Sequence, residues 1–239
     1  MGFPYNYNAG AYGRAYPGEL NVGDVMRMVY LWLCAGLILG FGVSFIVGNS
    51  DAPILRTGVV QLFALVAYLV VAFAFFPIIQ RASLTVGAAL YLGFTALFGL
   101  LVSSIWLYYS SQTITSAFIT TGAMFGIMSI LGYTTRIDLS KLGAIFLMAL
   151  IGLIVGSLVN LFMQNAAIYW VLTFAGIVIF CGLTAYDTQW IRRNAGSVAV
   201  SGDGQAAGRI ALVGAFRLFM DFVNLFLFLL RLFGQGGRR

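Results

Sequence analysis

The sequence predicts an all-α integral membrane protein, a bundle of seven transmembrane helices. Hydrophobic residues make up 61% of the 239 residues and charged residues only 8%, whereas a soluble domain carries about 25% charged residues. The apolar residues also gather into seven runs, each with the roughly 20 residues that a helix needs to cross about 30 Å of hydrocarbon. Lipid is therefore expected to be the solvent for most of the chain.

The seven predicted helices follow one another along the chain and are separated by polar breaks. Transmembrane β-strands would be about 10 residues long with alternating polarity, a pattern that this sequence lacks. The apolar runs are residues 28–48, 57–79, 84–107, 114–132, 142–163, 168–186 and 210–233. Residues 1–24, rich in Gly, Tyr and Asn, are expected to form a disordered polar tail before a transmembrane domain of residues 25–234. Residues 194–208, rich in Gly, Ser and Ala, are expected to be a long loop.

The basic residues predict the orientation of the bundle. The loops after the second, fourth and sixth runs carry Arg81, Arg136, Lys141, Arg192, Arg193 and Arg209. The other three loops between helices carry only Arg56. Because cytoplasmic loops of membrane proteins are enriched in Lys and Arg, we expect the N-terminus in the cytoplasm. Seven crossings then put Arg238 and Arg239 outside, against the same rule, so the side of the C-terminus stays open.

This scattered distribution also accounts for most of the net charge of +6, so we expect no nucleic-acid partner. The chain contains no His, and its two Cys residues, Cys34 and Cys181, stand in apolar runs. A Ser-His-Asp triad and the usual zinc ligand sets are therefore impossible. We expect neither an enzyme nor a bound cofactor, and any pH response near neutrality must come from carboxylates.

Pairs of glycines four residues apart occur in three of the apolar runs. They are Gly36/Gly40, Gly122/Gly126 and Gly152/Gly156. This spacing allows two helices to approach closely. Because such pairs arise often by chance in a chain with 29 glycines, we expect them to serve packing within the chain and not a dedicated dimer face.

Two aspartates stand inside otherwise apolar helices. Asp187 is placed at the cytoplasmic end of the sixth run and Asp221 about 11 residues inside the seventh. An ionisable group at membrane depth costs about 2.5 kcal/mol or more, so it normally faces the bundle interior and has a partner. Arg217 and Asn224 share the helix face of Asp221. The simplest interpretations are an in-helix ion pair between Asp221 and Arg217, and contact of Asp187 with water or Arg192.

The stronger hypothesis is that Asp187 and Asp221 meet within hydrogen-bond reach between the last two helices. Two close carboxylates cannot both ionise cheaply, so the pair would share a proton and act as a pH-sensing gate. The greater expected depth of Asp221 counts against contact. Arg81 is either a plain positive-inside anchor or a counter-charge to the pair. Carboxylate oxygens suit calcium, but two are too few for tight binding, so we expect weak calcium contact at most.

The residues around the aspartates resemble the Bax inhibitor family, the transmembrane Bax-inhibitor-motif proteins. Residues 218–234 read Leu-Phe-Met-Asp-Phe-Val-Asn-Leu-Phe-Leu-Phe-Leu-Leu-Arg-Leu-Phe-Gly. They are similar to the family's closing motif, Asp-Phe-x-Asn-Leu-Phe-x-x-Leu-Leu-Arg-x-Phe-Gly. Tyr186-Asp187 resembles its Tyr-Asp pair on the sixth helix. The resemblance covers residues 25–234 and implies a seven-helix bundle with the last helix central. It also implies a pH-dependent calcium leak gated by Asp187, Asp221 and Arg81, and, for a bacterial-type member, the inner (plasma) membrane.

Three functions remain open at this point. The first is a pH-sensitive cation leak. The second is a membrane regulator without transport, which binds a membrane protease or another membrane partner, a role that the resemblance implies for bacterial members. The third is an intramembrane aspartyl protease, which also has Tyr-Asp on its sixth helix. Its second motif, Gly-x-Gly-Asp, is missing here, because residues 218–220 before Asp221 are Leu-Phe-Met.

Overall fold

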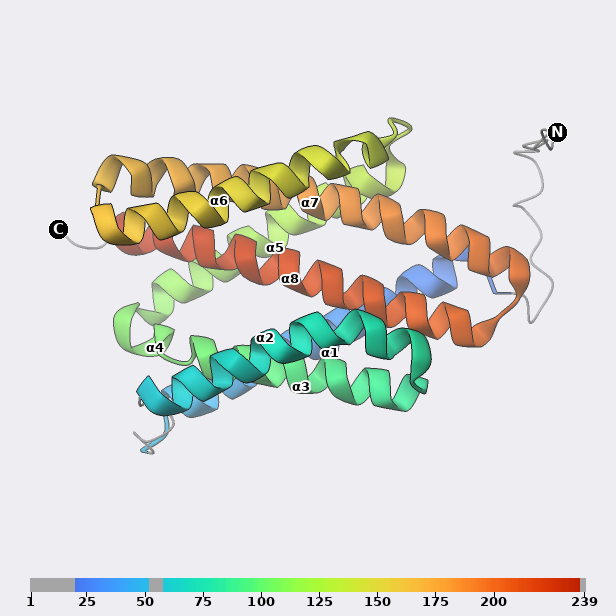
Figure 1. Ribbon diagram of the computed structural model, residues 1–239, viewed down its shortest axis with the longest axis horizontal. Helices are drawn as coiled ribbons and strands as arrows, with labels where there is room; N and C mark the ends of the chain where they lie inside the picture. Colours follow the sequence, from blue (N-terminus) through green and yellow to red (C-terminus); the bar gives the residue numbers. More distant parts are fainter. Residues whose placement is uncertain (1–19, 52–57, 237–239) are drawn as a thin grey trace.

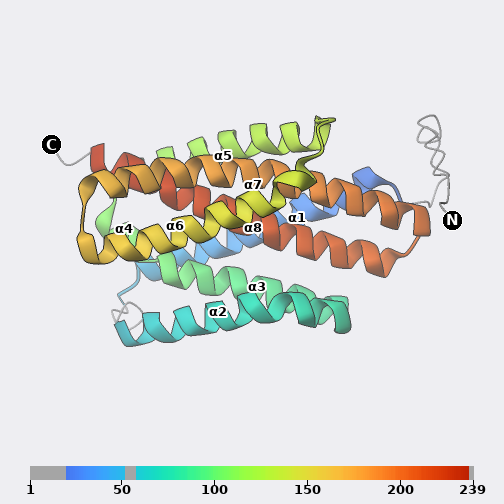
Figure 2. The ribbon, with the colours of Figure 1, turned by 45° about the horizontal axis from the view of Figure 1, so that its top comes forward.

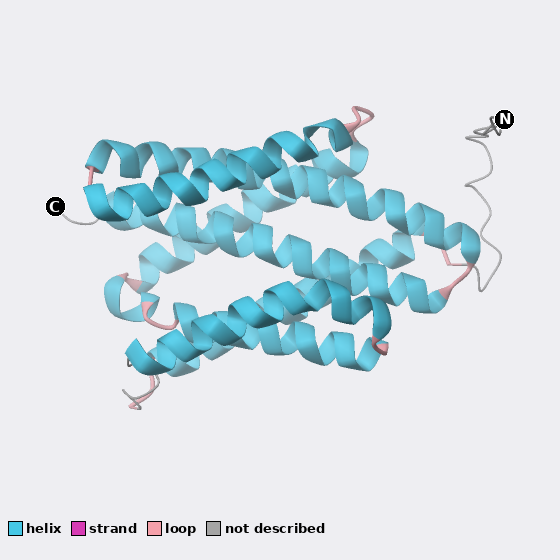
Figure 3. Cartoon of the chain, viewed as in Figure 1, coloured by secondary structure: helices cyan, strands magenta, loops and turns pink. Residues whose placement is uncertain are grey.

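The computed structural model describes residues 20–51 and 58–236, and within them it contains helices and short connections but no strand (Figure 3). Most of the predicted 1–24 tail, as well as Arg56, Arg238 and Arg239, lies outside the described residues. Seven of the described helices are long and apolar enough to cross a membrane. The prediction of an all-α protein with seven transmembrane helices is therefore confirmed.

The long helices lie side by side along one axis of the molecule (Figures 1 and 2). They are α1 Val22–Gly48, α2 Gly58–Arg81, α3 Leu84–Val102, α5 Ser111–Thr134, α6 Gly143–Met163, α7 Ala166–Ser201 and α8 Gly204–Gly236. A short helix, α4 Ile105–Tyr108, continues α3, and a 3₁₀ turn, η3 Leu139–Leu142, leads into α6. The connections alternate between two ends of the bundle, so that the α2–α3, α5–α6 and α7–α8 connections share one end (Figures 1 and 2).

Polar residues in the breaks start several of the helices. The side chains of Ser83, Ser110 and Asn165 accept hydrogen bonds from backbone N–H groups in the first turns of α3, α5 and α7. Asn21 and Asp24 form a reciprocal capping box at the start of α1. A free N–H group at a helix start is costly near hydrocarbon, so these residues fix where the helices begin.

The predicted loop over residues 194–208 is wrong. Helix α7 continues to Ser201, and α8 begins at Gly204, after only two intervening residues. Gly202 ends α7 in the left-handed backbone conformation, with φ +68°, which glycine adopts without strain. The side chain of Asp203 then accepts hydrogen bonds from the backbone N–H groups of Gln205 and Ala206, which starts α8.

Tertiary packing explains why this Gly- and Ser-rich stretch is helical. Ala195 and Val198 of the α7 extension form a small buried cluster with Val25 of α1 and Ala207 of α8. Small side chains let the three helices approach closely, and the buried contacts offset the poor helix propensity of glycine and serine. Helices α7 and α8 therefore run past the other helices as an antiparallel pair (Figure 1).

Helix α8 is the most buried of the seven. Over an apolar stretch of 18 residues in α8, 72% of the residues are buried, against 6–39% in such stretches of the other six membrane-length helices. It packs against α1, α2, α3, α5 and α7. The ring of Phe216 stacks on that of Phe75 from α2, with centroids 4.3 Å apart, and lies 4.6 Å from the ring of Phe94 from α3. These aromatic contacts fix the rotation of α8 about its own axis.

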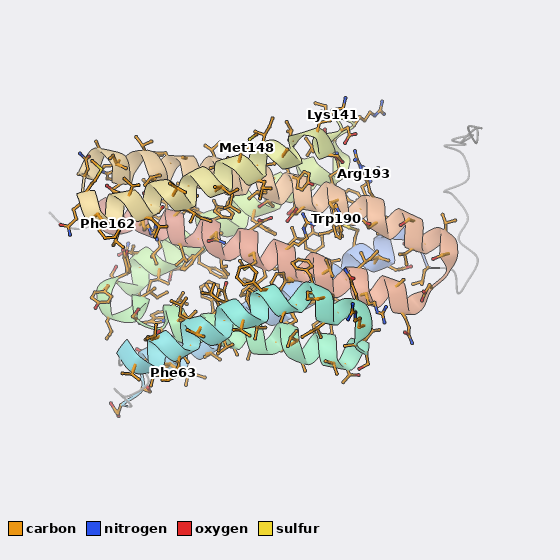
Figure 4. The ribbon with its side chains drawn as sticks, in the orientation of Figure 1. Phe63, Lys141, Met148, Phe162, Trp190 and Arg193 are labelled. Carbon is orange, nitrogen blue, oxygen red and sulfur yellow. The ribbon has the colours of Figure 1, made fainter. Side chains whose placement is uncertain are left out.

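The outer surface of the bundle is apolar. Phe63 of α2, Met148 and Phe162 of α6 point outward and are exposed (Figure 4). On a soluble protein such a surface would cause aggregation. On a helix bundle of this hydropathy it is the surface that contacts lipid chains.

The glycine pairs divide into packed and open ones. A side chain at Gly36 would collide with the hydroxyl of Tyr91, and a Cβ at Gly40 would lie 2.9 Å from the carbonyl oxygen of Thr95. The prediction of packing within the chain therefore holds for this pair. For Gly122 and Gly126 of α5 it is wrong, because no atom lies within 4 Å of an added Cβ. The third pair is mixed: Gly152 is open, and Gly156 faces Leu172.

The contact between α1 and α3 leads to a stability prediction. A Cβ at Gly99 would collide with the carbonyl oxygen of Gly40, which belongs to the rigid backbone. Gly99→Ala should therefore destabilise the protein by about 1–3 kcal/mol, the usual cost of overpacking. Gly93→Ala in the same helix is the control, because its Cβ meets no atom within 4 Å and alanine favours helix by up to about 1 kcal/mol. Unfolding in detergent micelles measures both; equal stability of the two variants would contradict the close contact.

Candidate functional site

Asp187 lies in the interior of α7 because that helix continues well past it. The helix ends at Ser201 instead of near Tyr186, so the expected difference in depth between Asp187 and Asp221 is smaller than predicted. Both aspartates are buried, with 5% and 4% of their surfaces exposed. Helix α5 covers α7 at this level, because Gly132 lies directly against the backbone of Ala185.

Asp187 forms an ion pair with Arg217 across the contact between α7 and α8. The distance from Nη2 of Arg217 to Oδ1 of Asp187 is 2.5 Å, and 25% of the arginine side chain is exposed. A charge-assisted hydrogen bond of this kind is among the strongest in proteins. The in-helix ion pair between Arg217 and Asp221 that the sequence allowed is not among the ion pairs of the described residues.

Aromatic rings of α7 hold the guanidinium of Arg217. Its Cζ atom lies 4.5 Å from the ring centre of Trp190 and 5.9 Å from that of Tyr186. Trp190 lies between α7 and α8 in Figure 4. A cation over an aromatic face is stabilised electrostatically, more so away from water. Sequence reasoning missed Trp190, although its position three residues after Asp187 puts it on the same helix face.

The second carboxylate, Asp221, is beside this ion pair but does not join it. Its Oδ2 atom is buried and has no hydrogen-bond partner among the described residues. Over the described ranges Asp187 bonds to Arg217 and not directly to Asp221, the contact that the sequence predicted. The reason is that Arg217, four residues before Asp221, reaches across to Asp187. Arg217 still interacts electrostatically with both carboxylates, so the three groups form one charged cluster.

Arg81 is not part of this cluster. It is the last residue of α2 and is exposed, and it forms no ion pair within the described ranges. The cation that contacts Asp187 is Arg217, which was predicted as a supporting residue. Asn224, the other supporting residue on α8, donates its amide hydrogen bond to the carbonyl of Met220 in its own helix, at 2.8 Å. It serves α8 and not the carboxylates.

A second contact that the sequence did not predict ties the α5–α6 connection to α7. The side chain of Gln189 accepts a hydrogen bond from the backbone of Leu139 and donates one to that of Ile137, both at 2.8 Å. One turn further along α7, Arg193 forms an exposed ion pair with Asp138 at 2.7 Å. These contacts place the stretch of α7 that carries Asp187 against a fixed loop.

The chemistry available at the site is that of two carboxylates and one guanidinium. Over the described ranges there is no group of three or more His, Cys, Asp or Glu residues that could hold a metal ion. Two carboxylates can bind a calcium ion only weakly, with the remaining ligands supplied by water or backbone carbonyls. A buried oxygen without a hydrogen-bond partner, such as Oδ2 of Asp221, is stabilised by a proton or by a cation that contacts it.

Comparisons with known proteins agree with the length and layout of the chain. A family model described as inhibitor of apoptosis-promoting Bax1 matches residues 22–238. The inner membrane protein YbhL of Escherichia coli strain K12 is 41% identical over 213 residues, which cover 88% of this chain and 91% of that protein. An uncharacterized protein of Deinococcus radiodurans is 38% identical over 212 residues, covering 88% and 90%. One from Caulobacter vibrioides is 32% identical over 250 aligned positions, covering 96% and 98%.

Proposed function

We propose that this chain, which belongs to the Bax inhibitor family of membrane proteins, is a pH-sensitive leak for cations such as calcium, gated by Asp187, Asp221 and Arg217. One observation carries the proposal. A buried ion pair joins α7 to α8, and four residues along α8 from its arginine a buried oxygen of Asp221 has no hydrogen-bond partner among the described residues. Ionisable groups at membrane depth are costly and are normally retained because they serve a function.

The proposed gate works through competition for carboxylate oxygens. A cation that crosses the membrane must exchange part of its water shell for oxygen ligands, and the two aspartates supply them. In the described conformation Arg217 occupies one carboxylate and repels other cations from both. Flux therefore requires that Arg217 move away from Asp187. Protons bind to the same oxygens, so the proton load on the pair changes its attraction for both Arg217 and the passing cation.

Arg217 takes the role that the sequence resemblance assigned to Arg81. It lies on the same helix as Asp221 and contacts Asp187 at 2.5 Å. Arg81, exposed at the end of α2, fits better as a positive-inside anchor. Loss of the Arg81 charge should then affect orientation or stability more than the pH response.

Calcium flux into liposomes, measured with the purified protein between about pH 5 and 8, tests the proposal. The wild-type flux should change with pH over this range. The double variant Asp187→Asn/Asp221→Asn should flatten that response without necessarily abolishing flux, because the amides cannot titrate. Asp203→Asn is the control, since Asp203 is an exposed helix cap, and asparagine caps helices equally well.

Two outcomes would contradict the gate. A double variant that keeps the wild-type pH profile would exclude these carboxylates as the titrating groups. A protein that gives no flux at any pH in the tested lipids would contradict transport itself. The alternative, a regulator that binds a membrane protease or another membrane protein without transport, would then become the leading proposal.

We also propose that the protein lies in the inner membrane with its N-terminus and the α7–α8 connection in the cytoplasm. The excess of Lys and Arg in the α2–α3, α5–α6 and α7–α8 regions supports this orientation.

The test is a single cysteine in a background without Cys34 and Cys181, placed at Val200, which is 84% exposed. It should react only with reagents that cross the membrane. A cysteine at Tyr108, at the other end of the bundle, should react with impermeant reagents on intact cells; the reverse pattern would overturn the orientation.

A further inference from the structure

A lateral groove of about 580 Å³ lies between α1 and α5, and none of its lining residues belongs to the charged cluster. Its base is formed by the rings of Phe125 from α5 and Phe222 from α8, whose centroids are 5.4 Å apart. Helix α1 contributes one wall, from Met26 to Leu37, and α5 the other, from Gly122 to Tyr133. The lining is almost entirely apolar, and its volume is typical of small-molecule sites, which are about 300–1,000 Å³.

One polar group in the groove has no partner. Ser129 is buried, with 6% of its surface exposed, and its Oγ atom makes no hydrogen bond within the described structure. Three threonines of the same helix, Thr115, Thr121 and Thr134, each donate to the backbone carbonyl four residues earlier. Ser129 does not use this usual solution. The Oγ atom is itself inaccessible to solvent, so this hydroxyl lies behind the lining and leaves the groove surface apolar.

The wall formed by α5 is open because of its glycines. Gly122 and Gly126 lie one turn apart and share a face with Ser129. No atom lies within 4 Å of a Cβ added at either glycine. These residues do not bring two helices of this chain together; they leave room along the α5 wall of the groove.

The dimensions of the groove favour a lipid chain over a helix. Each wall extends over 11 residue steps, or about 16 Å at 1.5 Å per residue, which is half of the roughly 30 Å hydrocarbon core. The groove therefore has the depth of one leaflet, which matches a single acyl chain better than a helix that spans the whole membrane.

A cation stands at the mouth of the groove. The guanidinium of Arg192 lies 5.2 Å from the ring centre of Tyr133 and donates a hydrogen bond to the carbonyl of the same residue. Arg192 is exposed and forms no ion pair in the described part of the chain. An arginine at the membrane surface is suited to a phosphate group, which accepts two hydrogen bonds from it.

We propose that this groove binds one acyl chain of an anionic glycerophospholipid. The order of groups along α5 matches such a molecule. The phosphate faces Arg192 at the level of Tyr133, and the ester groups follow one turn deeper. The acyl chain then lies along Gly126 and Gly122, against the rings of Phe125 and Phe222.

Native mass spectrometry of the full-length protein in mild detergent tests the proposal, after delipidation and titration with phosphatidylglycerol or phosphatidylcholine. The wild type should bind one phosphatidylglycerol more tightly than further copies of the lipid. Gly126→Leu, which fills the groove, should weaken that first binding by at least about tenfold. Gly152→Leu is the matched control, because Gly152 is equally open but lies on α6, outside the groove; it should bind like the wild type.

Two further variants test the polar groups. Ser129→Ala removes a hydroxyl that the groove surface does not expose, so it should fold normally and bind like the wild type. Arg192→Gln should reduce the preference for phosphatidylglycerol over phosphatidylcholine.

Equal binding by wild type and Gly126→Leu would overturn the proposal, because the lipid would then belong to the general lipid shell. A wild-type dimer that Gly126→Leu converts to monomers would also overturn it, because the groove would then contact a second copy of the chain.

Discussion

Replacing Asp187 by alanine is expected to lower the free energy of unfolding by about 3 kcal/mol. The reason is the charge that remains. Arg217 has only 25% of its side chain exposed and is paired with Asp187 at 2.5 Å. Breaking a buried ion pair from one side costs about 3–5 kcal/mol, because the other ion stays buried without its partner. The lower end applies here, since Asp221 and the ring of Trp190 still stabilise the guanidinium.

A second substitution separates this effect from the simple loss of contacts. Asp187→Leu combined with Arg217→Met should recover most of the lost stability, because well-packed apolar side chains often replace a buried ion pair at little cost. Asp138→Ala is the control, because Asp138 also pairs with an arginine but at the surface, where ion pairs contribute little. Unfolding of all variants in the same micelles provides the measurement. If Asp187→Ala is as stable as Asp138→Ala, the buried ion pair is not important for the fold.

Replacing Arg217 by glutamine is expected to raise calcium flux through reconstituted protein by about tenfold or more. At about 6 Å and an effective dielectric constant of about 20, a guanidinium and a divalent cation repel each other by roughly 5 kcal/mol. Removal of even a third of this repulsion from the barrier would increase the rate about tenfold. The glutamine also leaves the oxygens of Asp187 open to a cation.

Two other variants show whether charge at this position is the cause. Arg217→Lys keeps the positive charge and should keep flux close to the wild-type value. Arg209→Gln removes a charge from the same helix more than one turn before the cluster, where Arg209 bonds to the carbonyl of Ala82 at 3.4 Å; it should leave flux unchanged. Flux that falls in Arg217→Gln, or that rises equally in Arg209→Gln, would contradict a gate at Arg217.

The transmembrane helices could be predicted from the sequence because, in a membrane, each helix depends only on its own run of apolar residues. A run of about 20 apolar residues must span the bilayer as a helix, since no other isolated structure satisfies its backbone there. Breaks with Ser83, Ser110 and Asn165 carry the caps that start the helices. The number of helices and the approximate ends of the first five followed from this rule. The two aspartates also stood out, because charge inside such a run is rare.

Amino-acid composition gave a wrong prediction where tertiary packing determines the local structure. Residues 194–208 have the Gly, Ser and Ala content of a loop, yet they extend two helices, because Ala195 and Val198 are buried against α1 and α8. The same holds for the glycine pairs. Gly36/Gly40 and Gly122/Gly126 have identical spacing, and the first pair is packed while the second opens onto a groove. Spacing shows that a close approach is possible, but not which helix lies opposite.

By itself, the sequence determined the membrane solvent, the seven helices and the two buried aspartates, all of which follow from the residues in a single run. The tertiary structure alone decided that Asp187 pairs with Arg217, that Asp221 keeps an unpartnered oxygen, and that Arg81 stands apart. The partner of a buried charge depends on how α7 and α8 are rotated and shifted against each other. This rotation and shift are fixed by contacts such as the stacking of the Phe216 ring on the Phe75 ring, between residues 141 positions apart in the chain. No pattern within a single helix predicts such a contact.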